Sequence, residues 1–213
     1  MKLNLGPGPN IGHFNRKEWE FLDFDSNRAS KGLQIDFNKF SKIPRDSNFY
    51  SLVYGSHVLE HVSPYYIISF LKEIYRVMSP GAVFRIIIPD ARKSIEKYLN
   101  NEPYKLFDRR KSRYQTLHPS LIPMTNFEAM KECFISKSLQ SNLLEGKEYT
   151  PLAHQNAWDF ESMQSDLRRA GFKKENIFRS SYKSSLTTGF EFESKYPSEA
   201  MEDYRSMYIE AIK

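Results

Sequence analysis

Residues 49–90, FYSLVYGSHVLEHVSPYYIISFLKEIYRVMSPGAVFRIIIPD, decide the fold. Residues 49–55 have the short apolar pattern of a β-strand. Residues 83–88 form an almost entirely apolar, β-branched run, which is typical of a strand buried on both faces. Between them, apolar side chains recur at helical spacing, and Ser63-Pro64 can cap and open that helix. Strand, helix and strand predict a βαβ unit and therefore a parallel sheet.

The remaining chain supplies further elements to the same sheet. Short apolar stretches predict strands at residues 2–5, 21–24, 33–36, 175–180 and 206–212. Asp159 can cap a helix over residues 159–170, which Gly171 ends. The connections between the first three strands are shorter than usual crossovers. We therefore expect one sheet face to be poorly covered by this half, and to be closed by a partner subunit or by a later insert.

That insert is predicted at residues 100–152, which are mixed, aromatic and basic, within a single domain of residues 1–213. The net charge is +5, and a basic run at residues 105–113 fits a solvated surface or one that meets phosphate, acidic sugar or nucleic acid. The run lacks the aromatic–basic pattern of an RNA-binding module. Cys133 is the only cysteine, and no apolar run approaches the roughly 20 residues of a membrane span. We expect a cytoplasmic protein without a leader peptide.

The first strand runs directly into the turn Leu5-Gly6-Pro7-Gly8. Glycine has no Cβ, so a ligand can lie against the backbone there. A turn of this kind at the carboxyl end of a first parallel strand is where open α/β sheets bind nucleotide-like ligands. A nicotinamide-dependent dehydrogenase is disfavoured, because its GxGxxG pattern needs a glycine where Ile11 stands.

Together these motifs resemble the class I S-adenosylmethionine-dependent methyltransferases, and more narrowly a compact bacterial branch with shortened N-terminal crossovers. The motifs that carry the resemblance are LGPG at 5–8, WEFLD at 19–23, SHVLEH at 56–61, FLKEIYRVMSPG at 70–81, RIIIPD at 85–90 and RRAGF at 168–172. The resemblance covers nearly the whole chain outside residues 100–150. It implies an α/β, Rossmann-like, mostly parallel sheet of seven strands with the last antiparallel, reduced first helices, and S-adenosyl-L-methionine as the cofactor.

The resemblance also implies roles for residues at the strand ends. The glycine turn would hold the methionine and ribose portion, and Asp23, with Asp25 as the alternative, would accept the two ribose hydroxyls. Asp36 would accept from the adenine amino group, while the Phe37 amide would read a ring nitrogen. The expected cofactor contacts are Leu5, Gly6, Pro7, Gly8, Asp23, Asp36, Phe37, Ser56 and His57.

Two residues depart from the family pattern. Asn4 replaces the usual acidic residue before the first glycine, and Asn10 replaces a third glycine. Asparagine tolerates left-handed backbone, so the turn can survive at Asn10. Asn4 removes a charge near the amino group of the cofactor. These departures keep open the alternative of a non-catalytic binding protein with a methyltransferase fold.

The segment from His57 to His61 also spells HxxEH, a zinc-hydrolase pattern. Zinc binding by that pattern needs both histidines on one helix face and a third ligand downstream. The helix is predicted to begin after both histidines, so no metal site is expected, and His61 is assigned a structural hydrogen-bonding role.

Methyl transfer to oxygen needs a base near neutral pKa. His154, before the late helix, and Asp90, at the end of the fifth strand, are the predicted catalytic residues, with His118 as a third candidate. The insert is predicted to form the acceptor pocket or a lid. The resemblance favours a small-molecule or saccharide-type acceptor with an oxygen nucleophile. A homodimer is compatible with the sequence, and an RNA methyltransferase is a further alternative.

Overall fold

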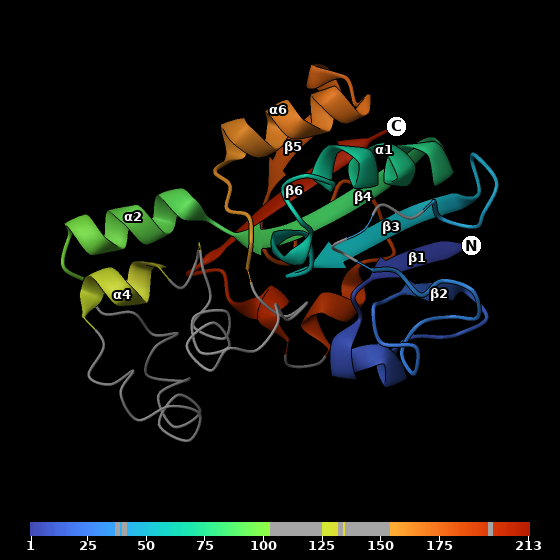
Figure 1. Cartoon of the computed structure of the whole chain (residues 1–213), viewed down its shortest axis with the longest axis horizontal. Helices are drawn as coiled ribbons and strands as arrows, with labels where there is room; N and C mark the ends of the chain where they lie inside the picture. Colours follow the sequence, from blue (N-terminus) through green and yellow to red (C-terminus); the bar gives the residue numbers. More distant parts are fainter. Residues whose placement is uncertain (37–38, 40–41, 103–124, 132–133, 135–153, 196–197) are drawn as a thin grey trace.

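The structure is a computed structural model that describes residues 1–36, 39, 42–102, 125–131, 134, 154–195 and 198–213. Its centre is one sheet whose strand order is β2-β1-β3-β4-β6-β5 (Figure 1). The strands are β1 (Lys2–Leu5), β2 (Trp19–Leu22), β3 (Tyr50–Ser56), β4 (Met78–Pro89), β5 (Ile177–Ser180) and β6 (Ser206–Ile212). The first four run parallel to one another, whereas β6 is antiparallel to both β4 and β5. The predicted α/β class and mostly parallel sheet are confirmed.

The prediction of seven strands is wrong for the described chain, which has six. Residues 33–36 add only one parallel bridge, between Asp23 and Gln34. The Ile35 amide donates to the Asp23 carbonyl at 3.0 Å, but the Leu33 amide turns back to the Ser30 carbonyl at 2.8 Å. Because only one amide of this stretch is directed at its neighbour, pairing stops after one bridge.

Two helices cover one face of the sheet, and their boundaries follow local hydrogen bonds. They are α1 (Ile67–Val77) and α6 (Phe160–Ala170). Asp159 caps α6 by accepting the Ser162 amide at 2.9 Å, as predicted. The expected side-chain cap at Ser63 is wrong, because the Ser63 carbonyl accepts the Ile67 amide at 3.0 Å and α1 begins only after that turn. Beyond the end of β4 lie α2 (Ala91–Leu99) and α4 (Asn126–Lys131) (Figure 1).

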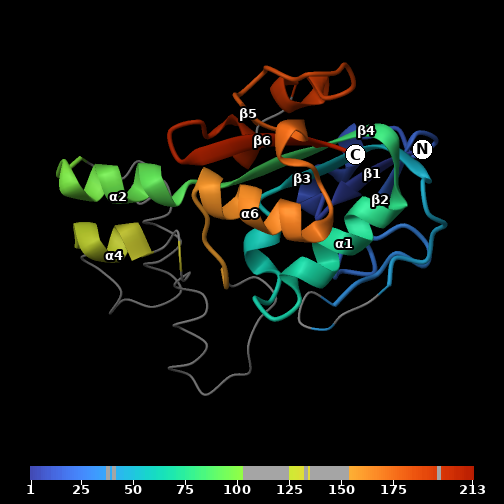
Figure 2. The ribbon, with the colours of Figure 1, turned by 90° about the horizontal axis from the view of Figure 1, so that it is seen from above.

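The opposite face is covered by the connection between β5 and β6, which carries the 3₁₀ turns η5 (Glu191–Ser194) and η6 (Glu199–Met201) (Figure 2). Its aromatic side chains pack on the sheet: the Phe192 ring lies 4.8 Å from both the Phe14 and Tyr54 rings, centroid to centroid. Arg85 anchors this connection, since its buried guanidinium pairs with Glu193 at 2.5 Å and with Glu210 at 2.8 Å. Among the described residues, this later segment covers the face for which a partner subunit or residues 100–152 were the predicted cover.

The other 3₁₀ turns are η1 (Gly8–His13), η2 (Leu59–His61) and η4 (Lys174–Asn176). The last of these occupies the start of the strand predicted at 175–180, so β5 begins only at Ile177. Within the described ranges, no helix has both the length and the apolar character that a bilayer crossing requires.

Candidate functional site

The sequence motifs meet at the carboxyl edge of the parallel strands. Leu5 at the end of β1 pairs with Leu22 on β2 and with Gly55 on β3. Ser56 pairs with Ile87 on β4. The residues that follow these strand ends, including the glycine turn and Asp23, therefore lie at one edge of the sheet. This is the edge at which open α/β sheets bind ligands.

Both glycines of the first turn have φ of +56°. A Cβ on Gly6 would lie 2.6 Å from Val58 Cγ2, so this position needs glycine for its conformation and for close packing. A Cβ on Gly8 would meet no atom of the described residues within 4 Å. Gly6 therefore lets the turn pack against the core, while at Gly8 the described part of the chain leaves space that a ligand can occupy. Leu5 and Pro7 are buried beneath the turn.

The Asp23 carboxyl lies next to this turn and is only 1% exposed. Its Oδ1 accepts the Asp25 amide at 3.0 Å. Burial raises the pKa of Asp23, against the opposing effects of the Asp25 amide, the Arg28 charge and the Gly8 amide. The Gly6 amide donates to the Leu22 carbonyl at 2.8 Å, and Asp23 is the next residue after Leu22, so the predicted ribose-binding carboxyl lies beside the glycine turn. Asp25 itself is engaged with Arg28 at 3.4 Å.

The predicted adenine contacts are only partly described. Asp36 is exposed, and its carboxylate lies 3.8 Å from Lys39 Nζ. Phe37, whose amide was predicted to read the adenine ring, lies outside the described residues. His118 also lies outside them, as do residues 103–124 and 135–153 of the predicted insert.

His57 follows β3 with φ of +51°, and its ring turns into the protein. Nδ1 lies 3.2 Å from Glu60 Oε1, and Nε2 lies 3.0 Å from Ser206 Oγ on β6. Both ring nitrogens are thus engaged by buried groups. A contact from His57 to a ligand at the strand edge would be made by its backbone, next to the half-buried Ser56.

Glu60, His61 and His154 form a cluster at the same edge. One potential ligand atom from each lies within 4.8 Å of the others, and the two imidazole centroids are 5.0 Å apart. Burial by itself raises the pKa of Glu60, but its hydrogen bond with His57 and the rings of His57, His61 and His154 lower that pKa to about 2. Glu60 is therefore ionised at neutral pH. Glu60 was not among the predicted site residues, although it is the acidic residue of the HxxEH pattern at residues 57–61.

The chain beyond His154 is hydrogen-bonded to the segment that carries the other two side chains. The Gln155 amide donates to the Glu60 carbonyl at 2.7 Å, and Gln155 Nε2 donates to the His61 carbonyl at 2.7 Å. Asn156 Nδ2 donates to the Val62 carbonyl. These bonds fix His154 against η2, although the two segments are far apart in sequence.

The Asp90 carboxylate caps α2. Its Oδ1 accepts the Arg92 amide at 3.0 Å and the Lys93 amide at 3.3 Å, and the side chain is buried. A parallel bridge joins Asp90 to Trp158, just before α6. The structure thus places Asp90 and the chain segment of His154 at the end of the same strand. The catalytic role predicted for each stays a prediction.

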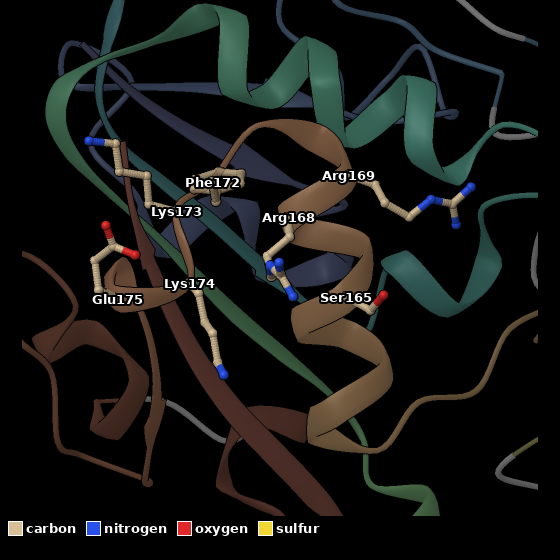
Figure 3. A pocket seen from close by; sticks show the side chains of 7 residues that line it. All are labelled: Ser165, Arg168, Arg169, Phe172, Lys173, Lys174 and Glu175. Carbon is tan, nitrogen blue, oxygen red and sulfur yellow. The ribbon is translucent and has the colours of Figure 1, made fainter.

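An open pocket of about 600 Å³ lies elsewhere, around the end of α6 (Figure 3). Its lining segment leads into β5, whose first residue, Ile177, pairs with Ala211. Ala211 pairs with Phe84, whereas the carboxyl end of β4, at Pro89, pairs with Ser206 at the other end of β6. The pocket is therefore at the opposite edge of the sheet from the glycine turn. Its lining residues are Ser165, Arg168, Arg169, Phe172, Lys173, Lys174 and Glu175.

No protein-family model matches the chain, and no curated protein matches it in sequence. Two solved structures are similar over its length. One comes from a complex between the Haloferax volcanii Trm112 methyltransferase activator and a methyltransferase: 11% identity, 99% of this chain and 80% of that chain, TM-score 0.51. The other is an S-adenosylmethionine-dependent methyltransferase from Mesorhizobium loti: 14% identity, 100% of this chain and 90% of that chain, TM-score 0.51. The chain therefore has the class I S-adenosylmethionine-dependent methyltransferase fold.

Proposed function

We propose that the protein is an S-adenosyl-L-methionine-dependent methyltransferase that acts on a small-molecule or saccharide-type acceptor at oxygen. The observation that carries this proposal is the proximity of the Gly6–Gly8 turn to the end of β2, where Asp23 follows, at the carboxyl edge of this fold. The open space in front of Gly8 gives a ligand access to the backbone. A carboxylate beside such a turn suits a ribose, whose two hydroxyls can both donate to it.

Each predicted contact has a defined task in this proposal. Leu5, Gly6, Pro7 and Gly8 supply the backbone against which the methionine and ribose portion lies. Asp23 orients the ribose, while Asp36 and Phe37 bind the adenine. Ser56 and the His57 backbone would contact the part of the cofactor that carries the sulfonium. The cofactor supplies an electrophilic methyl group, and the chain holds the acceptor oxygen in line with it and excludes water.

On the acceptor side, the hydroxyl proton must leave as the oxygen–methyl bond forms and the sulfur–methyl bond breaks. His154 is the proposed group that receives this proton, because its imidazole lies at the strand edge beside the Glu60 carboxylate. Asp90 is the second proposed group, although its Oδ1 already accepts two backbone amides. The acceptor pocket is assigned to residues 100–152, where the sequence resemblance stops.

Binding of the demethylated cofactor tests the proposal. S-adenosylhomocysteine should raise the melting temperature and bind with one site per chain in calorimetry. Radiolabelled methyl transfer to a panel of sugars and hydroxylated metabolites would then identify the acceptor. No thermal shift at millimolar ligand would support the alternative of a non-catalytic binding protein, which the near-complete burial of Asp23 and the presence of Asn4 favour. An RNA methyltransferase is not favoured, and a homodimer stays a prediction.

A further inference from the structure

We propose that Glu60, His61 and His154 bind one divalent transition-metal ion at the carboxyl edge of the sheet. The ligands would be a Glu60 carboxylate oxygen and one imidazole nitrogen from each histidine. One such atom from each residue lies within 4.8 Å of the others. Bonds of about 2.1 Å to a tetrahedral ion place ligand atoms about 3.4 Å apart, so small side-chain rotations close the site.

The Glu60 carboxylate shows the need for a cation. The side chain is 0% exposed, and among the described residues its Oε2 has no hydrogen-bond partner. A buried carboxylate oxygen without a partner is costly, whereas one bound to a metal ion is satisfied. The two neighbouring imidazoles are the commonest protein ligands for such ions. Glu60 therefore combines an oxygen without a hydrogen-bond partner among the described residues with two imidazoles close to its carboxylate.

The surroundings orient this carboxylate as metal sites require. Glu60 Oε1 is bound by His57 Nδ1 at 3.2 Å, and His57 Nε2 is bound by Ser206 Oγ at 3.0 Å. Hydrogen bonds of this kind behind a ligand fix its direction and leave the other oxygen for the ion. The Gln155 amide, donating to the Glu60 carbonyl at 2.7 Å, holds the His154 segment in place.

The site differs from the one that the HxxEH pattern suggested and that the sequence analysis rejected. The rejected site required His57 and His61 on one helix face. His57 instead contacts Ser206, and its place is taken by His154 from the segment before α6.

Two imidazoles and one carboxylate suit Zn²⁺, Mn²⁺, Fe²⁺ or Co²⁺ better than Mg²⁺ or Ca²⁺, which prefer oxygen ligands. Three protein ligands leave a coordination position open. An acceptor hydroxyl bound there would lose its proton more readily, with the proton passing to solvent. His154 would then be a ligand and not the base. This catalytic part rests on the proposed function, whereas binding of the ion does not.

Cobalt binding tests the site directly. Tag-free, chelator-treated protein should bind one Co²⁺ per chain, with visible absorption bands and a raised melting temperature. Glu60→Gln keeps the side-chain shape but removes the anionic ligand, and it should weaken binding by about 100-fold or more. His154→Asn should do the same. His13→Asn is the matched control, because His13 is exposed on η1 outside the cluster, and it should bind Co²⁺ as the wild type does.

The proposal is overturned if wild-type protein binds no Co²⁺ or Zn²⁺ at micromolar concentrations. It is also overturned if folded Glu60→Gln and His154→Asn proteins, verified by circular dichroism, bind Co²⁺ with unchanged affinity. Should both variants fail to fold, His61→Asn provides the same comparison, and the stoichiometry of the wild type stands independently. S-adenosylhomocysteine binding is measured in parallel. Metal binding without nucleoside binding would refute only the proposed function, and the reverse result would refute only the metal site.

Discussion

Replacing Asp23 with asparagine should weaken cofactor binding without weakening the fold. A carboxylate that accepts two ribose hydroxyls makes two charge-assisted hydrogen bonds, and an amide offers one neutral oxygen in their place. A hydrogen bond to a charged group contributes about 1.5–3 kcal/mol, so losing one raises the Kd for S-adenosylhomocysteine by about 10- to 150-fold. The asparagine oxygen can still accept the Asp25 amide, which is 3.0 Å from Asp23 Oδ1.

The same substitution has a defined effect on stability. Burial raises the pKa of Asp23 above the ordinary 3.8, so the folded protein binds this proton more tightly than the unfolded chain does. The contribution of Asp23 to stability therefore falls as the pH rises from the ordinary value through the raised one. The asparagine side chain of the variant does not titrate in this window. The unfolding free energy of Asp23→Asn should consequently rise relative to that of the wild type as the pH increases towards neutrality.

Calorimetric titration at neutral pH and urea unfolding from acidic to neutral pH measure the two effects. Asp25→Asn is the matched control, because Asp25 is engaged with Arg28 at 3.4 Å and is expected to change affinity by less than about threefold. Unchanged affinity in Asp23→Asn would refute the assignment of the ribose contact. A large loss in Asp25→Asn alone would transfer that contact to Asp25.

Three further predictions concern the fold. Gly6→Ala should lower the unfolding free energy by about 2–5 kcal/mol, because φ is +56° and the new Cβ meets Val58 Cγ2 at 2.6 Å. Adding Val58→Ala should recover part of this loss in urea unfolding, and no recovery would contradict the clash. Arg85→Met should lower the unfolding free energy by about 3–5 kcal/mol, because it leaves the buried Glu193 carboxyl without its guanidinium partner. Near-ultraviolet circular dichroism should report loosened aromatic packing, and an unchanged urea midpoint would contradict this prediction. Partial burial raises the pKa of Glu20, but hydrogen bonds from an arginine and a tyrosine lower it below 4.5, so its contribution to stability should be lost as the pH falls below that value. In Glu20→Gln, the unfolding free energy should therefore fall less steeply with decreasing pH in the acid range, and an unchanged acid dependence would refute this.

Local sequence signals were sufficient for the central part of the fold. The βαβ unit of residues 49–90 follows from apolar periodicity, and the Asp159 cap and the Gly171 end of α6 follow from residue chemistry. The glycine turn and Asp23 were placed at one edge by the rule that parallel strands end together. These predictions needed only contacts that are close in sequence or fixed by sheet direction.

The rest depended on contacts between distant segments. Nothing near residues 33–36 indicates that the Leu33 amide turns back to Ser30, which ends strand pairing after one bridge. The covering of the second face depends on Phe192 meeting Phe14 across the sheet. The approach of His154 to Glu60 likewise required the bridge that aligns the chain before α6 with the end of β4.

A crystal structure with S-adenosylhomocysteine tests the central claim most directly. The account predicts the nucleoside across the Gly6–Gly8 turn, with both ribose hydroxyls within hydrogen-bonding distance of the Asp23 carboxylate. Nucleoside density in the basic pocket at the end of α6, with the glycine turn covered by protein atoms, would contradict it.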